Sequence, residues 1–410
     1  MDKYTTFIGQ PIFLQLIKYI PRHIIRKIER KQQTNRYIKK FNGYNHLVTL
    51  LFSLFARCDS LREISSGMLS QANRLSHLGI TYIARRSTLS DANKRRDSAF
   101  FAELYYALRN QYADFLSDSR SIKRSKYKLN IIDSTTITLF KEILKGTGQS
   151  PKGGRRKGGI KVHTLIDSDS CLPNLAVMTA AAENDVDFFD KIKALKLLKG
   201  SFLVFDKGYI NYANYEDLTA QGITYVTKRI NRAKFKLIEE RPGNVESPLI
   251  VCDQVVEFSK KADYVKGTPK IKHKARCIVY KASEEAEELI FQTNNFTIPA
   301  MDVVEIYHRR WKIETLFKQL KQNFELKYFL GDNVNAIESQ IWVVLIANLL
   351  ISIVKKQIKR KCSFTGVVSL LRIHIMNYVS MIDLLENPDR AWIELNRRQN
   401  IKQNLLLFSP

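Results

Sequence analysis

The sequence predicts an α/β protein, with a mixed-sheet core that a β-rich insertion interrupts and with helical regions at both ends. Three observations support this class. Short apolar runs alternate with helical segments in residues 126–228, alternating polar and apolar residues mark strands in 229–295, and apolar residues return at helical spacing at both ends. Hydrophobic residues make up 45% of the 410 residues, which is enough to bury a core, and the length suggests two or three domains.

These patterns divide the chain into five segments. We expect a helical N-terminal region in residues 1–125, the first part of the core in 126–228 and the β-rich insertion in 229–295. The rest of the core follows in 296–332, and a helical C-terminal region fills 333–410.

The charge of the chain points to a polyanionic partner. Lys and Arg number 66 against 40 Asp and Glu, a formal net charge of +26, and nucleic acid is the commonest partner of so basic a protein. A membrane surface is the alternative. However, Met1–Gln10 is polar, and the apolar run Ile341–Val354 is shorter than the roughly 20 residues that span a bilayer. We therefore expect Ile341–Val354 to be a buried helix and the partner to be nucleic acid, with no membrane association.

Basic residues concentrate near the N-terminus. From Met1 to Lys40, ten Lys and Arg residues stand against two acids, Asp2 and Glu29. A solvated helix face would explain this excess, but in so basic a chain a contact with the DNA backbone is the favoured interpretation.

A helix-turn-helix is one interpretation of residues 60–96. Ser60 has the character of a helix cap, Leu78-Gly79-Ile80 supplies a turn, and Ser87–Arg96 follows as a polar helix. An ordinary surface helix has a similar sequence, so both interpretations stay open. If the motif is present, the residues that would contact DNA are Lys94, Arg95 and Arg96.

The core segment contains short strands that later alternate with helices. A basic glycine loop, Gly153–Gly159, lies between the first two strands. Three strands joined by hairpins and followed by alternating helix and strand give a mixed sheet in a ribonuclease H-like order. The expected strands are 129–133, 160–166, 175–178, 202–206 and 223–227, and the expected helices are 185–198 and 212–220.

The insertion is expected to be a small set of paired strands. Val255–Phe258 and Arg276–Tyr280 alternate polar and apolar residues and should pair with Glu288–Gln292. Pro299 then opens a long helix that should run to about Phe324, and residues from about 335 onward are helical again.

Two carboxylates occur where apolar strands end. Asp133 and Asp206 lie in otherwise apolar runs, where an ionised carboxylate is costly unless a positive charge offsets it. A divalent ion such as Mg²⁺ is the simplest offset, because it prefers oxygen ligands, and a third acid from a helix would complete a two-metal site. The alternative is that each aspartate only caps a turn. After Asp206, Lys207 could contact phosphate, and Gly208 lets the backbone come close to it.

The helix after Pro299 carries the most informative pattern. Tyr307, Arg310, Glu314 and Lys321 are separated by three, four and seven residues, which places all four on one side of a helix. This face would present a metal-binding carboxylate beside cations and a phenol. The alternative is an ordinary amphipathic helix with an Arg310–Glu314 ion pair. The opposite, apolar face consists of Ile306, Ile313, Leu316, Phe317 and Leu320.

These motifs resemble those of the IS4-type transposases. The family signature Tyr-x2-Arg-x3-Glu-x6-Lys is matched without a gap by Tyr307, Arg310, Glu314 and Lys321. The two aspartate motifs are matched by Ile131–Thr135 and Phe205–Tyr209, and Gly159–His163 is similar to the segment between them. The resemblance covers roughly Tyr127–Leu330 in motif order.

The resemblance implies a fold and a site. It implies a retroviral integrase-type, ribonuclease H-like core with a β-rich insertion. In that core, Asp133, Asp206 and Glu314 form the catalytic triad and hold two Mg²⁺ ions, for which Mn²⁺ can substitute. It also implies that Tyr307, Arg310 and Lys321 contact phosphates near the cleaved end. Further candidate DNA contacts are Lys207 and the loop residues Arg155, Arg156 and Lys157.

The implied activity is cut-and-paste transposition. The enzyme would bind the terminal inverted repeats of an insertion sequence, cleave its ends and join the 3′-hydroxyls to target DNA, without a small-molecule substrate. A homodimer on paired ends is expected, with the apolar helices from Asn335 as its contact. Five scattered cysteines without a CxxC pair fit the cytoplasm, where the DNA-bound protein would lie on the nucleoid. The alternatives are a transposase-derived DNA-binding protein that does not cut, and a nuclease that does not join strands.

Relatives in this family form a DNA hairpin and stack a flipped base on a tryptophan of the insertion. Here the three tryptophans, Trp311, Trp342 and Trp392, all lie outside the insertion. If a base is flipped, we expect another aromatic residue to stack on it, and the candidates are Phe258, Tyr264 and Phe291.

Overall fold

A computed structural model of the chain was analysed. Contacts divide the chain into two compact units, a helical unit of Met1–Leu116 with Gln319–Pro410 and a sheet unit of Ser117–Lys318. Apart from a few single residues, the structure describes residues 9–117, 127–138, 159–181, 188–195, 197–230, 233–241, 247–261, 270–324, 329–390 and 393–394.

The helical unit combines both ends of the chain. The first and last segments, which the sequence suggested as separate regions, therefore belong to one compact body. Its helices from the N-terminal part are α1 Ile12–Ile17, α2 Arg22–Lys31, α3 Gly43–Ala56, α4 Leu61–Ser70, α5 Ala72–Leu75, α6 Arg86–Arg95 and α7 Ala99–Leu116. Those from the C-terminal part are α12 Val334–Gln357, α13 Phe364–Ile373 and α14 Met381–Glu386.

The long helix α12 is the centre of the helical unit. It packs against α3, α6, α7 and α13, and its Trp342 lies against the rings of Tyr105 and Tyr106 on α7, with centroids 5.8 and 5.4 Å away. By length and composition α12 could cross a membrane, but 89% of its most apolar window is buried inside the protein. The prediction of a buried helix at Ile341–Val354 is confirmed. These side chains form the core of the unit, so the buried face of α12 is not a dimer contact, and a contact through the other C-terminal helices stays a prediction.

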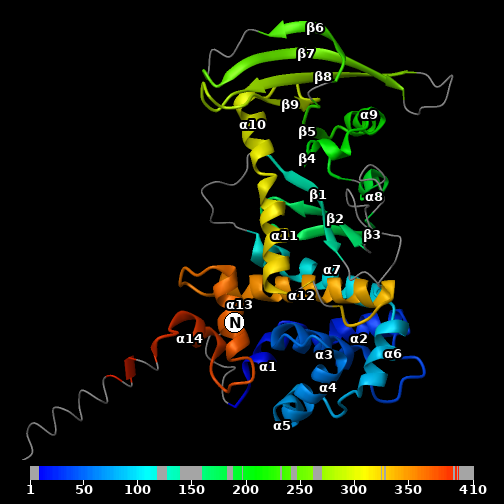
Figure 1. The fold of residues 1–410 in the computed structure, drawn as a ribbon, viewed down its shortest axis with the longest axis vertical. Helices are drawn as coiled ribbons and strands as arrows, with labels where there is room; N and C mark the ends of the chain where they lie inside the picture. Colours follow the sequence, from blue (N-terminus) through cyan, green and yellow to red (C-terminus); the bar gives the residue numbers. More distant parts are fainter. Residues whose placement is uncertain are drawn as a thin grey trace, which may run out of the picture. The chain divides into compact units, whose positions relative to one another are not determined.

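The sheet unit contains a single nine-stranded sheet among the residues that the structure describes, in the order β3-β2-β1-β4-β5-β9-β8-β7-β6 (Figure 1). The strands are β1 Leu129–Thr138, β2 Gly159–Asp167, β3 Pro173–Ala180, β4 Phe202–Phe205, β5 Thr224–Lys228, β6 Phe235–Arg241, β7 Ile250–Lys261, β8 Lys270–Tyr280 and β9 Leu289–Thr293. The helices are α8 Phe188–Ala194, α9 Tyr212–Ala220, α10 Ala300–His308 and α11 Trp311–Asn323, whose last residues count with the helical unit.

The pairing confirms the expected mixed sheet. Strands β1, β2 and β3 are joined antiparallel, whereas β1–β4 and β4–β5 are parallel. The strands of the β-rich segment continue the same sheet, because β9 pairs antiparallel with β5. One detail differs from expectation. Val255–Phe258 pairs with β8 and β6 and not with β9, because β8 lies between β7 and β9.

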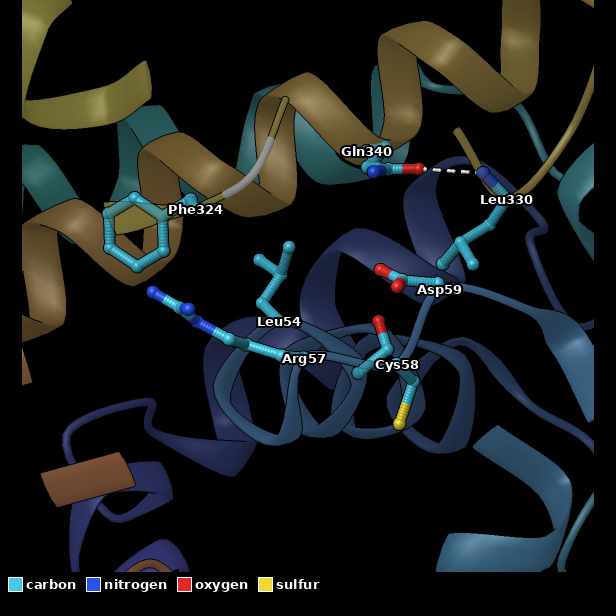
Figure 2. Close-up of a pocket in the computed structure, with 8 residues that line it drawn as sticks. Leu54, Arg57, Cys58, Asp59, Phe324, Leu330 and Gln340 are labelled. Carbon is cyan, nitrogen blue, oxygen red and sulfur yellow. Dashed lines mark hydrogen bonds between the residues drawn. The ribbon is translucent and has the colours of Figure 1, made fainter. Parts of the chain in front are cut away.

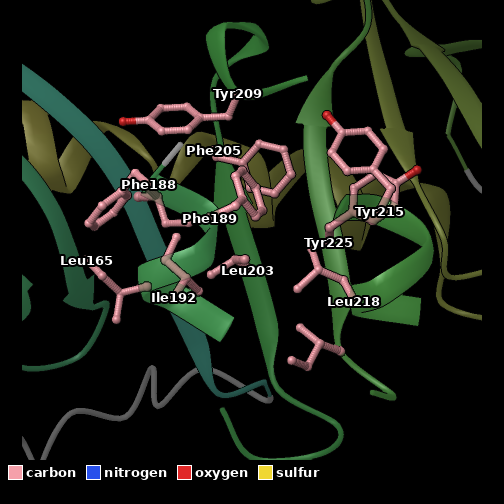
Figure 3. Packing of buried hydrophobic residues seen from close by; sticks show 12 residues of the cluster. Leu165, Phe188, Phe189, Ile192, Leu203, Phe205, Tyr209, Tyr215, Leu218 and Tyr225 are labelled. Carbon is pink, nitrogen blue, oxygen red and sulfur yellow. The ribbon is translucent and has the colours of Figure 1, made fainter. Parts of the chain in front are cut away.

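Aromatic side chains fill the core between the sheet and its helices α8 and α9 (Figure 3). Tyr215 of α9 stacks on Tyr225 of β5 with ring centroids 4.3 Å apart, and Phe205 of β4 lies against both rings. Figure 1 shows α8 and α9 on one side of β1, β4 and β5, and α10 and α11 on the other. Side chains of these strands therefore divide between two buried faces.

The helix after Pro299 is interrupted, where one continuous helix was expected. It forms α10 and α11 with a turn at Arg309–Arg310 between them. At the break the backbone bonds tighten to the i→i−3 pattern: Arg310 N–H donates to the Tyr307 carbonyl and Ile313 N–H to the Arg310 carbonyl. The apolar face is as expected, with Ile306, Ile313, Leu316, Phe317 and Leu320 all buried.

Candidate active site

The strand register sets Asp133 and Asp206 side by side. Leu129 of β1 pairs with Phe202 of β4, and Ile131 pairs with Val204. Two residues further along each chain, Asp133 and Asp206 therefore lie at the same level, and adjacent strands are about 4.8 Å apart. This juxtaposition follows from the sheet alone.

Both aspartates face α10 and α11. Their neighbours Ile132 and Phe205 belong to the core beneath α8 and α9. Because successive side chains of a strand point to opposite faces, Asp133 and Asp206 point to the other side. On that side α10 packs against β4 and β5.

Tyr307, at the end of α10, contacts Asp206. Its hydroxyl donates a hydrogen bond of 3.4 Å to Asp206 Oδ1, and its ring packs on Phe291 with centroids 5.0 Å apart. Burial, with Asp206 nearby, raises the pKa of Tyr307 to about 12, although Arg310 opposes the shift. The phenol therefore remains protonated at neutral pH and can orient the carboxylate.

Arg310, in the turn between α10 and α11, joins the other two acids. Its Nη1 lies 3.1 Å from Asp133 Oδ2, and its Nη2 lies 2.6 Å from Glu314 Oε1. Burial acts to lower the pKa of Arg310, but Tyr307, Asp133 and Glu314 together raise it. Among the described residues, the buried Nε of Arg310 has no hydrogen-bond partner.

The charge of Asp133 is costly where it lies. Burial raises its pKa to about 6, and the nearby carboxylates of Asp206 and Glu314 act in the same direction. The Ser134 backbone N–H, which donates a 2.8 Å bond to Asp133 Oδ1, and the Arg310 guanidinium oppose the shift. Burial is therefore the main reason that the Asp133 carboxylate resists ionisation, and the two neighbouring acids add to it.

The composition of this cluster fits divalent metal ions. Three carboxylates are the hard oxygen donors that Mg²⁺ and Mn²⁺ prefer. In the part of the chain that the structure describes, no three acidic, His or Cys side chains converge closely enough to ligate one ion as they stand. The reason at this site is visible, since the Arg310 guanidinium lies between Asp133 and Glu314. Asp133, Asp206 and Glu314 are the residues that would hold metal.

Further side chains anchor the site, and the sequence patterns did not indicate them. Lys312 Nζ donates a 2.6 Å bond to the Ser168 carbonyl in the β2–β3 turn, which fixes the start of α11. Arg276 of β8 holds Asp253 of β7 in a buried ion pair of 2.6 Å and also donates to the Ile298 carbonyl just before α10. Each of these contacts joins residues far apart in sequence, so local spacing carries no signal for them.

The other predicted DNA contacts have different surroundings. Lys207 is exposed directly after Asp206, and Lys94 and Arg95 are exposed on α6, where Arg95 pairs with Asp91 at 2.8 Å. Lys321 lies on α11, seven residues after Glu314. The loop residues Arg155, Arg156 and Lys157 lie outside the described residues.

The prediction that Arg96 contacts DNA is corrected. It is buried, and its guanidinium donates a 2.8 Å bond to the Phe41 carbonyl, so it is not available to a phosphate at the surface. Burial lowers its pKa to about 10. The spacing of the helices also does not fit a helix-turn-helix. A turn of three or four residues is needed, but α5 has only four residues and residues 79–85 separate the following 3₁₀ turn from α6.

Two of the three aromatic candidates for base stacking are also corrected. Phe258 and Phe291 are fully buried in the sheet unit, and Tyr264 lies outside the described residues. Trp311, which follows Arg310 directly, is 63% exposed. Among the residues that the structure describes, Trp311 of α11 is thus an exposed aromatic residue adjacent in sequence to Arg310 of the acidic cluster.

A pocket in the helical unit is too small to be an alternative binding site for a substrate. Leu54, Arg57, Phe324 and Gln340 are among the residues around it, and it offers about 20 Å³, room for a single water (Figure 2). One wall is fixed by the Gln340 side chain, which accepts a 3.0 Å bond from Leu330 N–H.

Comparison with known proteins gives two family matches. Residues 124–350 match the transposase DDE domain, and residues 8–81 match a domain of unknown function, DUF4372. A provisionally named transposase, y4zB, of Sinorhizobium fredii is 30% identical over 65% of this chain and 70% of its own length. The provisionally named transposase of insertion sequence element IS4SA from Synechocystis sp. is 23% identical over 72% of this chain and 78% of its own length.

Two weaker similarities are also to proteins named as transposases. A transposase assigned to insertion sequence element IS5377 of Geobacillus stearothermophilus is 23% identical over 59% of this chain and 60% of its own. A piggyBac transposase synaptic complex with hairpin DNA covers 95% of this chain and 85% of its own, at a TM-score of 0.44 and 11% identity. That structural likeness is too weak to assign fold or function.

A sheet that sets two aspartates beside a helix-borne glutamate, within a matched DDE domain spanning more than half of the chain, defines a metal-dependent DNA-cleaving enzyme. The chain belongs to the DDE transposase family, and its type is that of the IS4 insertion sequences.

Proposed function

We propose that this transposase binds the terminal inverted repeats of its element, cleaves both ends and joins the 3′-hydroxyls to target DNA in a cut-and-paste reaction. The observation that carries the proposal is the arrangement of the three acids. Asp133 and Asp206 lie level on adjacent strands, and one guanidinium links Asp133 to Glu314. The proposal includes two Mg²⁺ ions at these carboxylates, with Mn²⁺ able to substitute.

The three acids would hold the ions, and the neighbouring side chains would position DNA. When bound, the two ions supply Lewis acidity for the attacking and leaving oxygens of an in-line displacement. Tyr307 orients Asp206 through its hydroxyl. Arg310 has an unused Nε–H that can donate to a phosphate oxygen. Lys207, exposed beside Asp206, supplies a further positive charge.

The chemistry consists of one hydrolysis and one transesterification. In the first, water attacks the phosphodiester at the element end, the P–O3′ bond breaks, and the leaving oxygen takes a proton to become a 3′-hydroxyl. In the second, this hydroxyl loses its proton and attacks a target phosphodiester, forming a new P–O bond as the target P–O3′ bond breaks. Neither step changes an oxidation state.

Trp311 is the side chain best placed to hold a base if the second strand is cut through a hairpin. It is exposed and directly follows Arg310, so a nucleotide next to the scissile phosphate would be within reach of its ring. Stacking of one base on an aromatic ring contributes about 1–3 kcal/mol. We extend the proposal to a homodimer on paired DNA ends, acting in the cytoplasm on nucleoid DNA.

Excision in cells tests the proposed function. A marker flanked by the DNA ends that border the gene is followed with the wild type, Asp206→Asn and Glu314→Gln. The expected result is excision with the wild type alone. If the purified wild type binds those ends but cuts nothing with Mg²⁺ or Mn²⁺, a DNA-binding protein without cleavage activity replaces the proposal. If ends are cut but never joined, a nuclease does.

A further inference from the structure

The loop between α2 and α3 presents two adjacent apolar side chains to solvent. Tyr37 is 88% exposed and Ile38 is 40% exposed, whereas Ile25 and Ile28 of α2 are buried. Isolated exposed apolar residues are common, but an aromatic and a branched aliphatic residue together at a loop tip form a small apolar wedge. We refer to Tyr37 and Ile38 as the apolar tip.

The loop is held in one conformation. Gln33 and Tyr37 have positive φ angles of 51° and 63°, which side-chain-bearing residues rarely adopt unless the surroundings impose them. Backbone bonds from Arg36 N–H to the Gln33 carbonyl and from Ile38 N–H to the Asn35 carbonyl close the turns. The Asn35 side chain also accepts a 2.8 Å bond from Gly43 N–H, which ties the loop to the start of α3.

Arg36 fixes the ring of the tip. Its guanidinium carbon lies 5.0 Å from the centroid of the Tyr37 ring, and its Nη2 donates a 3.2 Å bond to the Tyr37 hydroxyl. These contacts favour one orientation of the ring, which lowers the side-chain entropy that binding would cost.

Positive charge surrounds the tip on both sides. The only acid between Arg22 and Lys40 is Glu29, which is half-buried and accepts a 3.1 Å bond from Tyr44 N–H. Lys31 pairs with Glu103 at 2.7 Å. The exposed basic residues of this stretch of the sequence are Arg26, Lys27 and Arg30 on α2, and Arg36, Lys39 and Lys40 on the loop.

We propose that this loop inserts Tyr37 and Ile38 into the minor groove of duplex DNA while the flanking Arg and Lys side chains bind phosphates of both strands. An apolar wedge flanked by cations is the combination that unstacks a base step and bends DNA. An acidic protein surface is the alternative partner, and a wild type that bends neither duplex would favour it. The inference rests on the proposed function, since it takes DNA as the substrate. It adds a groove contact within residues 8–81, whose matched domain has no described function.

Binding and bending of DNA test this inference separately. The purified full-length protein is titrated into two end-labelled duplexes of equal length, one carrying the element end and one of random sequence. Anisotropy gives affinity at several salt concentrations, and energy transfer between the labels gives the bend. The variants are Tyr37→Ala, Tyr37→Phe, Ile38→Ser and the pair Lys39→Gln/Lys40→Gln. The control is Leu69→Ala on α4, which removes a side chain that is 61% exposed in the same unit.

The expected results separate the wedge from the charges. Tyr37→Ala and Ile38→Ser should each weaken binding about 10-fold and abolish most of the bend, at an unchanged salt slope, whereas Tyr37→Phe and Leu69→Ala should behave as the wild type. The Lys39→Gln/Lys40→Gln pair should lower the salt slope by about 1.8, because each phosphate that a lysine no longer neutralises removes roughly 0.9 from it.

Two results overturn the inference. Wild-type bending by Tyr37→Ala and Ile38→Ser shows that the tip does not enter the groove, whatever their affinity. If the wild-type protein bends neither duplex, the tip does not enter the groove either. Equal affinity of the wild type for both duplexes is a distinct outcome. It counts against specific recognition of element ends, while a bend that depends on Tyr37 and Ile38 still supports the wedge.

Discussion

Arg310 balances part of the negative charge of the acidic cluster. Its side chain is largely buried and contacts Asp133 and Glu314 at 3.1 and 2.6 Å. A divalent ion at these carboxylates would compete with the guanidinium for the same oxygens. Metal binding and the position of Arg310 are therefore coupled, and the guanidinium released from Glu314 would be free to contact phosphate.

The first prediction concerns this coupling. Arg310→Gln leaves two close carboxylates without their cation and should lower the stability of the metal-free protein by about 2 kcal/mol. Mg²⁺ should then raise the melting temperature more in Arg310→Gln than in the wild type, because the ion no longer competes with a guanidinium. Thermal melts with and without Mg²⁺ measure both effects. Arg309→Gln, which changes the neighbouring half-buried arginine, is the control, and equal Mg²⁺ effects in all three proteins would refute the coupling.

The second prediction concerns pH. The pKa of Asp133 is raised from 3.8 to about 6 in the folded protein. A raised folded-state pKa means that this contribution to stability is complete below pH 3.8 and is lost as the pH rises through 6. Asp133→Asn should thus stabilise the metal-free protein by up to about 3 kcal/mol at pH 7.5, with the difference vanishing near pH 4. Urea unfolding across this range measures it, with exposed Asp169→Asn as control. A destabilised Asp133→Asn protein at pH 7.5 would contradict the argument.

At the scale of elements, the register of β1 and β4 and the position of α10 decide whether the site forms. Arg276 and Asp253 make a buried pair between β8 and β7, and Arg276 also donates a 2.6 Å bond to the Ile298 carbonyl before α10. The strands of the β-rich segment thereby fix the start of the helix that carries Tyr307. The β-rich segment is therefore part of the support of the active site.

The third prediction tests that support. Asp253→Ala leaves the buried Arg276 guanidinium without its counter-ion and should cost about 3–5 kcal/mol in the free energy of unfolding. Urea denaturation measures the loss. Glu257→Gln is the matched control on the same strand, because its contact with Lys272 is exposed and 4.0 Å long, and it should change stability by at most about 0.5 kcal/mol. Similar small losses in both variants would mean that the buried pair is not a structural anchor.

The helix around Glu314 shows which features local sequence can predict. The buried face of Ile306, Ile313 and Phe317 follows from periodicity, which is a local property, and it is found as expected. The break at Arg309–Arg310 has no local signal, since Arg310 is held by Asp133, 177 residues away in sequence. The same limit explains Arg96, whose burial depends on Phe41, 55 residues away. The three acids and the i,i+4 pair of Arg310 with Glu314 could be chosen from local patterns, but the contact of Arg310 with Asp133 required the fold.

At the scale of the whole molecule, a C-terminal helix packs against the N-terminal helices of the same unit. The helices before residue 116 do not close a core by themselves, because α3, α6 and α7 pack on α12, which follows the entire sheet unit in sequence. Apolar composition correctly predicted that α12 is buried, but composition cannot say against what. The partner proved to be the N-terminal helices of the same chain, so the buried face of α12 is not available for the proposed dimer contact.

The last prediction tests this closure with two tryptophans. Trp342 is buried against Tyr105 and Tyr106 of α7, so Trp342→Ala should destabilise the protein by about 3–5 kcal/mol. Hydrogen exchange should accelerate in α3 and α7, more than 200 residues earlier in the chain, because these helices lose the same core. Trp311→Ala removes the same side chain from an exposed position and should leave stability and exchange unchanged while reducing hairpin formation on DNA. If Trp342→Ala left exchange in α7 untouched, the first 116 residues would have to fold independently of α12, and the division of the molecule into one helical unit built from both chain ends would not hold in solution.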